Sequence, residues 1–428
     1  MPNDSSKDKF FYDQFLKNPD KSLLRIYDIL LKLGSPQKSL TNVIHIAGTN
    51  GKGSTLAFLQ SCLIKSGYSV NAFISPHLKL LNERIVINNN TVNDETLEAI
   101  IKECMKTLDN EKISFFEFIT ACAYKLFAKN LSDWHLIEVG MGGSHDATNT
   151  LPNKDLSIIT PISLDHENFL GNTLKKIAKE KLGIINQGSQ VIFGPQDNCL
   201  KDIILEHLSL TNSKGFFYKD DWDIKKINNL IVYEDSDSRL EINSIGLKGD
   251  HQIKNAGLSI ASLKCLERDG KINISDEQIK QGLKEVYWPG RFSMLSGKLT
   301  NIVNDSCDIW VDGCHNPAGS KVIAKEILSM NKTDGKEVVI VLGLLKKRNI
   351  ENFIQNFSDI SKEIIVVPIK DRQSIDESEV KIITKKMNYS TSSKGSITQA
   401  LSSLKGRENL RILICGSLYL AAEAISLD

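Results

Sequence analysis

The segment that most constrains the fold of this chain is a glycine-rich turn, AGTNGKGS, at residues 47–54. Residues 42–47 before it form a short β-rich run, and residues 54–65 after it repeat apolar positions at helical spacing. A strand, a glycine-rich turn and a helix in this order form a phosphate cradle, because glycines let backbone N–H groups approach an anion and the helix N-terminus favours negative charge. Lys52 adds a cation, so the sequence predicts nucleotide binding in an α/β domain.

The turn departs from the usual phosphate-loop spacing at one position. Gly53 stands where the pattern G-x-x-x-x-G-K-[ST] has a hydroxyl residue, and the hydroxyl arrives one residue later, at Ser54. The residues that we expect to contact the nucleotide here are Thr49, Asn50, Gly51, Lys52, Gly53 and Ser54. Such a loop alone is compatible with a kinase, an ATPase, a GTPase switch or a ligase.

Strand-like and helical patterns alternate along most of the chain. The strand-like runs are residues 69–74, 134–139, 156–160 and 190–193, and the helical ones are 21–33, 94–108, 115–130 and 174–185. Such alternation predicts βαβ units around a mainly parallel sheet. Between about Phe216 and Leu247 the pattern changes to short alternating runs with turn residues between them, which predicts a small antiparallel sheet.

The segment WPGRF, at residues 288–292, predicts a joint between two domains, because Pro289 and Gly290 interrupt the preceding helical pattern. Four more strand-like runs follow, separated by helical stretches, at 308–311, 337–342, 364–368 and 410–415. We therefore expect a nucleotide-binding domain at residues 1–288 and a smaller Rossmann-like α/β domain at residues 289–428.

Composition narrows the classes of partner. The 53 Lys and Arg residues nearly balance the 52 Asp and Glu residues, so the sequence favours neither broad nucleic-acid binding nor attraction to an anionic membrane. The longest apolar stretch, residues 338–345, is far shorter than the roughly 20 residues of a membrane-spanning helix. The polar N-terminal residues show no secretory signal, and the eight cysteines form no CxxC pair. We expect a cytoplasmic protein with reduced, buried cysteines.

Several motifs follow one another in a fixed order along the chain. They are GTNGKGS at 48–54, SPHL at 75–78, EVGMGG at 138–143, LDH at 164–166, HQIKNA at 251–256, WPGR at 288–291 and VDGCHNPA at 311–318. Together they resemble the motifs of folylpolyglutamate synthases and dihydrofolate synthases, which belong to the Mur ligase superfamily of ATP-dependent amide-forming enzymes. Gly53 favours this folate branch, since other Mur ligases usually have Thr or Ser after the lysine.

The resemblance implies a catalytic centre that contains metal ions. Ser75 and Glu138 correspond to magnesium ligands, and carboxylate and hydroxyl oxygens suit such a hard cation. His166 corresponds to the ligand of a second metal ion, so two Mg²⁺ ions and a possible monovalent cation are implied. Lys181 corresponds to a lysine that the family carries as a carbamate, formed with CO2. Lys52, Lys181 and His166 are thus the implied catalytic residues.

The resemblance also implies which residues contact ATP and the other substrates. Further nucleotide contacts fall on Asn255, Arg291, Asp312 and His315. Contacts to the pterin and benzoate groups fall on Ser114, Phe115, Phe116, Glu117, His145, Asp146 and Ala147. Two segments depart from the family pattern: Ser144 and His145 replace the usual Arg and Leu, and GLLKKRN at 343–349 replaces an acidic pattern.

The implied function is a ligase that joins L-glutamate to dihydropteroate, to the terminal glutamate of folates, or to both. ATP would first convert the acceptor carboxylate into an acyl phosphate, a step that needs charge neutralisation and alignment more than a protein nucleophile. The alternatives are a Mur-type ligase acting on a peptidoglycan precursor and, from a different class, a nucleotide-dependent switch. The expected partners are small molecules only, and the family resemblance suggests a monomer.

Overall fold

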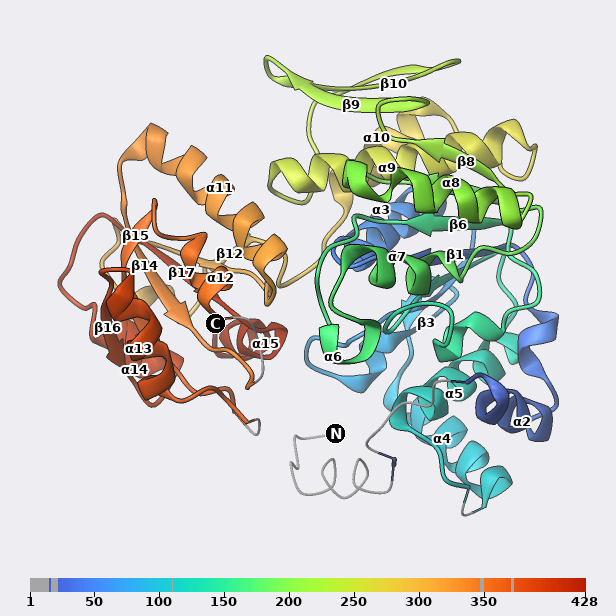
Figure 1. Cartoon of the computed structure of the whole chain (residues 1–428), viewed down its shortest axis with the longest axis horizontal. Coiled ribbons are helices and arrows are strands. Elements are labelled where there is room, and N and C mark those ends of the chain that lie inside the picture. The colour runs from blue at the N-terminus through green and yellow to red at the C-terminus, as the bar shows by residue number, and fades with distance from the viewer. Residues whose placement is uncertain (1–14, 17–21, 110, 347–349, 371–372) are drawn as a thin grey trace. The chain divides into compact units, whose positions relative to one another are not determined.

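The computed structural model describes residues 15–16, 22–109, 111–346, 350–370 and 373–428 (Figure 1). The chain divides into two compact units. The first comprises Met1–Ile245 and Ile253–Val286, and the second comprises Gly246–Gln252 and Tyr287–Asp428. Among the residues so described, no helix combines the length and the apolar character that crossing a bilayer requires.

The first unit is built on an eight-stranded, mainly parallel sheet. Its strands are β1 (Val43–Ala47), β2 (Val70–Phe73), β3 (Ile85–Ile87), β4 (Asn90–Thr91), β5 (Trp134–Glu138), β6 (Leu156–Ile159), β7 (Gln190–Phe193) and β8 (Lys214–Phe217). Their spatial order is β4-β3-β2-β5-β1-β6-β7-β8, and only β3 and β4 pair antiparallel. Because parallel strands end at the same edge of a sheet, the motifs that follow β1, β2, β5 and β6 converge there.

Helices cover the faces of this sheet. They are α2 (Leu24–Lys32), α3 (Lys52–Lys65), α4 (Asp94–Leu108), α5 (Phe115–Lys129), α6 (Glu167–Leu170), α7 (Leu174–Leu182), α8 (Lys201–Leu210), α9 (Asp250–Arg268) and α10 (Asp276–Glu285). All five residues of β1 are buried, as a central parallel strand requires. Helix α3 packs so closely on α10 that a Cβ atom on Gly282 would lie 2.6 Å from the Cα atom of Cys62.

A small antiparallel sheet follows the large one, as the sequence predicts. It consists of β9 (Trp222–Ile227), β10 (Leu230–Asp235) and β11 (Arg239–Ile242). The predicted start at Phe216 is wrong, because Phe216 and Phe217 belong to β8, the parallel edge strand of the large sheet. The Phe217 ring stacks on Phe193 of β7 with centroids 4.8 Å apart, and this apolar contact favours pairing with the large sheet.

The second unit contains a six-stranded sheet. Its strands are β12 (Ser293–Met294), β13 (Asp308–Val311), β14 (Glu337–Leu342), β15 (Ser361–Val366), β16 (Ser390–Ser393) and β17 (Leu410–Cys415), in the order β12-β13-β17-β14-β15-β16. Its helices are α11 (Pro317–Asp334), α12 (Ile350–Gln355), α13 (Glu377–Lys386), α14 (Ile397–Ser402) and α15 (Leu418–Leu427). All pairings except β12–β13 are parallel. The two units together confirm the predicted α/β fold class.

Strand β14 shows why helices lie on both faces of the second sheet. Val338, Ile340 and Leu342 belong to one hydrophobic core, whereas Val339 and Val341 belong to another on the opposite face. Of the predicted departure GLLKKRN that follows β14, residues 347–349 lie outside the described residues.

The cysteines are all free thiols, as predicted, but they are not all buried. Six are buried, Cys307 is half-buried, and Cys199 is exposed. Cys199 lies in a short surface turn before α8, where its backbone N–H donates to the Asp197 carboxylate at 2.9 Å. An exposed turn offers no apolar neighbours to cover the sulfur, which explains why the expectation of burial fails at this position.

Candidate active site

The glycine-rich turn connects β1 to α3 and depends on glycine at two positions. Gly48 has a φ of +144°, and a Cβ atom there would lie 1.8 Å from Thr160 Oγ1. Gly51 has a φ of +92° and precedes α3, and a Cβ atom there would lie 2.6 Å from Asn255 Oδ1. Both backbone conformation and lack of space therefore exclude larger residues. Asn255, predicted from a distant motif, lies directly against the turn.

The turn is anchored to the segment that follows β6. The backbone N–H groups of Thr49 and Asn50 donate to the Pro161 carbonyl at 3.0 and 3.4 Å. Thr49 Oγ1 donates to the Ser163 carbonyl and accepts from the Ser163 N–H, both at 3.0 Å. Helix α3 begins at Lys52, two residues earlier than predicted, so its first turn presents the backbone N–H groups of residues 52–54 at the end of the sheet.

Two lysine amines lie beside this turn. Lys181 Nζ reaches from α7 and donates to the Gly48 carbonyl at 2.8 Å, while Lys52 Nζ lies 3.3 Å from the same oxygen. Burial lowers the pKa of Lys181 to about 7, and the positive charge of Lys52 adds to this effect against the opposing charges of Asp165, Asp146 and Glu180. A substantial fraction of the Lys181 amine is therefore neutral near pH 7.

Ser75 and Glu138 lie together beyond the ends of the adjacent strands β2 and β5. The Ser75 backbone N–H donates to Glu138 Oε2 at 3.1 Å, and both side chains are buried. Ser75 Oγ has no hydrogen-bond partner within the described part of the chain. A buried hydroxyl without a partner next to a carboxylate offers two hard oxygen ligands, which fits Mg²⁺.

The structure contains no larger metal cluster in the residues that it describes: no three His, Cys, Asp or Glu side chains are grouped to hold an ion. His166 is exposed and precedes α6 with a φ of +51°. Its backbone N–H donates to the Asp165 carboxylate at 2.8 Å, and Asp165 is itself buried. The predicted ligands therefore come from three separate loops.

Asp146 anchors the loop that follows β5. Its carboxylate accepts hydrogen bonds from the Met141 N–H at 2.8 Å and from the Thr148 hydroxyl at 2.6 Å. Burial raises the pKa of Asp146, although these hydrogen bonds oppose the shift. Because the Thr148 hydroxyl donates to Asp146, it accepts from Nε2 of the buried His45 at 2.9 Å. Asp146 thus shapes the loop, and the neighbouring Ala147 is buried at the start of a 3₁₀ turn.

The predicted SFFEF segment opens α5 and supports its own helix. Ser114 and Glu117 form a capping box, and the Glu117 carboxylate also holds Arg25 of α2 through hydrogen bonds of 2.7 to 3.1 Å. The Phe116 ring lies where a Cβ atom on Gly140 would come within 2.3 Å, and Phe115 packs edge-on against Phe15 at 5.7 Å. The described contacts of these four residues are therefore structural.

His145, one of the two departures from the family pattern, lies on the surface. Its Nδ1 atom is 3.3 Å from Glu180 Oε2, on the helix that carries Lys181. Ser144, the other departure, is bonded to the Glu180 carbonyl through its backbone N–H at 2.7 Å and its hydroxyl at 3.1 Å. The departures thus lie beside the end of α7.

In the second unit, Arg291, Asp312 and His315 gather at the end of β13. The Asp312 carboxylate accepts from the backbone N–H groups of Phe292 and Cys314 at 2.8 and 2.7 Å. Burial raises the pKa of Asp312, and the positive charge of Arg291 is the largest opposing influence. His315 Nδ1 lies 3.0 Å from the Gly313 carbonyl. The three predicted residues therefore form one polar cluster.

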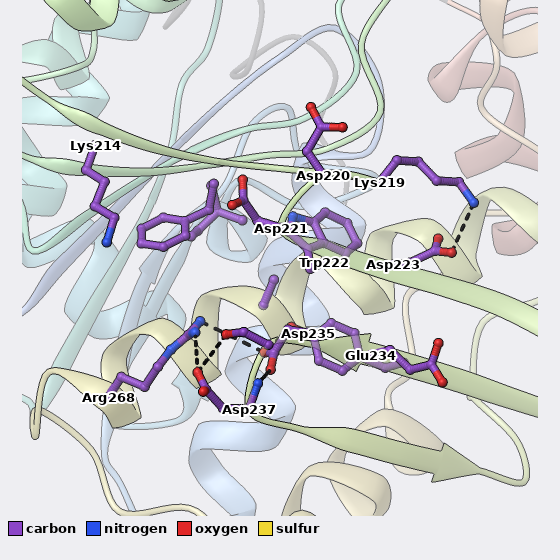
Figure 2. Close-up of a pocket in the computed structure, with 15 residues that line it drawn as sticks. Lys214, Lys219, Asp220, Asp221, Trp222, Asp223, Glu234, Asp235, Asp237 and Arg268 are labelled. Atoms are coloured by element: carbon purple, nitrogen blue, oxygen red, sulfur yellow. Dashed lines mark hydrogen bonds and ion pairs between the residues drawn. The ribbon is translucent and has the colours of Figure 1, made fainter.

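Figure 2 shows a pocket of about 620 Å³ elsewhere in the first unit, between β8, the β9–β10 hairpin and α9. Several of its charged groups pair with each other: Arg268 lies 3.0 Å from Asp237, and Lys219 lies 3.0 Å from Asp223. None of the predicted site residues lines this pocket. Its size alone does not make it the catalytic site, because its charges are already satisfied.

Sequence reasoning missed several residues of the site. Asp165 lies inside the LDH motif, where only His166 was assigned, so the motif itself contained the signal. Arg25 and Lys154 lie outside every motif, and Arg25 pairs with Glu117 across 92 residues. Arg84 belongs to the segment after SPHL and donates to His77 Nδ1 at 2.8 Å.

Comparison with known proteins adds to this geometry. Residues 46–263 match the Mur ligase middle domain. The chain is 31% identical to a dihydrofolate synthetase of Saccharomyces cerevisiae, with 94% of this chain and 96% of that protein covered. It is 30% identical to a dihydrofolate synthase/folylpolyglutamate synthase of Bacillus subtilis, with 93% of each covered. The solved structure of E. coli FolC in complex with DHPP and ADP has a TM-score of 0.86 at 24% identity, and covers 99% of this chain and 97% of that one.

Proposed function

The chain belongs to the dihydrofolate synthase/folylpolyglutamate synthase family of Mur ligases, and from this membership we propose the reaction that it catalyses. It is an ATP-dependent ligase that joins L-glutamate to dihydropteroate, to the terminal glutamate of folates, or to both. The observation that best supports this reaction is the arrangement at the end of β1, where Lys52 and the buried Lys181 meet at the Gly48 carbonyl.

The reaction proceeds in two steps. An oxygen of the acceptor carboxylate attacks the γ-phosphorus of ATP, the bond to ADP breaks, and an acyl phosphate forms. The amino group of L-glutamate then attacks the acyl carbon, the C–O bond to phosphate breaks, and the nitrogen loses a proton. In the first step, Lys52 and the N–H groups of residues 52–54 neutralise and align the phosphates. Asn255, Arg291, Asp312 and His315 are proposed as further nucleotide contacts.

Magnesium belongs to the proposal because Ser75 and Glu138 fit it. The partner-free hydroxyl of Ser75 within the described structure and the adjacent carboxylate of Glu138 supply two oxygen ligands, and phosphate and water supply the rest. When bound, Mg²⁺ neutralises charge on the transferring phosphoryl group. His166 is the candidate ligand for a second ion, and a monovalent cation completes the proposed set.

Lys181 is proposed to react with CO2. Its neutral amine forms the N–C bond, one C=O electron pair moves to oxygen, and the nitrogen releases a proton, which leaves a carbamate anion. The pKa of about 7 supports this step, because an amine with its usual pKa would be almost fully protonated at neutral pH. The carbamate would place negative charge beside the phosphate loop, where metal ions are needed. The proposal also includes a monomer that acts in the cytoplasm on small molecules.

The test is ADP release measured in parallel with dihydropteroate, with tetrahydrofolate and with a UDP-sugar acid, each with ATP and Mg²⁺, with and without L-glutamate. Release that requires glutamate and either folate precursor supports the proposal. Activity confined to the UDP-sugar acid would favour a peptidoglycan ligase, and release without glutamate would favour a nucleotide switch.

A pair of variants on one helix assigns the phosphate loop in the same assay. Lys52→Ala is expected to lower glutamate-dependent ADP release by about a hundredfold or more, as loss of a phosphate-binding charge does. Lys65→Ala is the matched control, because Lys65 lies at the other end of α3 and pairs with Glu285. Equal activity of the two variants would refute the assignment of Lys52.

A further inference from the structure

Lys154 is a buried lysine that the proposed reaction does not use. It lies two residues before β6 and is 9% exposed. Its Nζ atom donates to Asn149 Oδ1 at 2.6 Å and to the Ile184 carbonyl at 2.7 Å. Burying a lysine is costly unless its donors find partners, and here the partners come from two other segments of the chain. The side chain therefore ties these two segments together.

Asn149 extends this connection. Its Nδ2 atom donates to the Gly183 carbonyl at 3.0 Å and to the Ser144 carbonyl at 3.2 Å. Ser144 in turn donates to the Glu180 carbonyl through its backbone N–H and its hydroxyl. The carbonyls at residues 180, 183 and 184, at and just beyond the end of α7, thus all accept hydrogen bonds from the loop at residues 144–154. Carbonyls at a helix end lack intrahelical donors, and a positive charge there is favourable.

The contact between this loop and α7 leaves little room for movement. A Cβ atom on Gly143 would lie 2.5 Å from the Glu180 carbonyl oxygen and 3.0 Å from the Lys181 Cα atom. A Cβ atom on Gly183 would lie 2.0 Å from Ser144 Oγ. Lys181 is the penultimate residue of the nine-residue helix α7, so the docking of this helix end sets the position of its Cα atom.

We propose that Lys154 is a positioning residue, which acts through Asn149 and the Ile184 carbonyl to hold the end of α7 where the Lys181 amine meets the phosphate loop. This inference rests on the proposed function, since it assigns to Lys154 the placement of the amine that becomes the carbamate. Without the connection, α7 keeps its helical fold, but Lys181 Nζ is no longer held 2.8 Å from the Gly48 carbonyl. Lys181 then binds CO2 less favourably.

The test compares Lys154→Met with wild type in CO2-depleted buffer to which bicarbonate is added. Glutamate-dependent ADP release is one readout, and the ¹³C signal of a lysine carbamate formed from ¹³C-bicarbonate is the other. Loss of one or two buried hydrogen bonds corresponds to about a tenfold change in an equilibrium. We expect half-maximal activity and half-maximal carbamate signal to need about tenfold more bicarbonate in Lys154→Met, with maximal activity largely restored.

The matched control is Lys264→Met, which removes a second buried lysine of the same unit. Lys264 Nζ donates to Glu267 and Asp276, both at 2.9 Å, and it belongs to none of the motifs of the proposed site. The control is expected to lose stability but to keep the bicarbonate dependence of wild type. Asn149→Ala breaks the same connection at another point, so its effect should not add to that of Lys154→Met.

The outcomes separate this inference from the function on which it rests. Wild type that releases no ADP in response to glutamate overturns the proposed function. Wild type that is active, with Lys154→Met needing no more bicarbonate than Lys264→Met, overturns the inference alone. If Lys154→Met does not fold, Asn149→Ala carries the same comparison, and an unchanged bicarbonate dependence in that variant also overturns it.

Discussion

Replacing Lys181 with methionine should abolish activity and yet stabilise the protein. The amine is buried, and burial is the main reason that its pKa falls from 10.5 to about 7. A base whose pKa is lower in the folded state than in the unfolded state binds its proton more weakly when folded. Folding therefore carries a cost that is complete below pH 7 and disappears as the pH rises toward 10.5. Methionine has a similar shape and carries no such cost.

The size of the effect follows from the pKa. A fall of this size corresponds to on the order of 5 kcal/mol at about 1.4 kcal/mol per unit, and the lost hydrogen bond to Gly48 offsets about 1 kcal/mol. Relaxation around a buried charge reduces the remainder. We expect Lys181→Met to raise the free energy of unfolding by on the order of 3 kcal/mol at pH 6 and by less than about 1 kcal/mol at pH 9.

The assay is denaturant unfolding of both proteins between pH 6 and pH 9, without nucleotide and in CO2-free buffer, so that no carbamate forms. Lys264→Met again serves as the control. Desolvation lowers the pKa of Lys264, but Glu267 and Asp276 outweigh it and raise the pKa, so this substitution should destabilise the protein across the same pH range. A difference between Lys181→Met and wild type that does not change with pH would refute the reasoning.

Two further predictions concern neighbours of this site. Ser75→Ala removes a hydroxyl that has no partner within the described structure, so the free energy of unfolding should change by less than about 0.5 kcal/mol, while the Mg²⁺ concentration for half-maximal ADP release should rise about fivefold or more; an unchanged Mg²⁺ requirement would contradict the assignment of this ligand. Gly183→Ala places a methyl group 2.0 Å from Ser144 Oγ at an ordinary helical φ, so it should cost about 1 to 3 kcal/mol of unfolding free energy, and Ser144→Gly in the same chain should restore most of the loss; failure of that rescue would show that the crowding lies elsewhere.

The sequence predicts the parts of the site that depend on local pattern. The turn at residues 47–54 lies where β1 and α3 require it, because glycine at a positive φ and a lysine at a helix start can be read directly from the sequence. The convergence of SPHL and EVGMGG is also predictable, since both follow parallel strands that are neighbours in the sheet. Ser75 and Glu138 thus come together for reasons of topology.

The residues that sequence reasoning could not place are those whose role depends on tertiary contact. Lys154 looks like any surface lysine in a turn, and only the folded chain shows that its amine meets the Ile184 carbonyl. Glu117 looked like a pocket residue, but it forms a capping box and an ion pair with Arg25. Phe216 was placed in the small sheet because short alternating runs do not reveal which sheet a strand joins.

The exposed thiol in the turn before α8 makes this enzyme convenient to label. Cys199 is the only exposed cysteine of the eight, and six of the others are buried. A maleimide fluorophore should therefore attach mainly at one position of the native chain without any cysteine being removed. The neighbouring Asp197 raises the pKa of the Cys199 thiol, chiefly through a side-chain hydrogen bond, so labelling should proceed faster in mildly alkaline buffer. A single dye on the first unit would then report on ligand binding by anisotropy or by energy transfer to a fluorescent nucleotide.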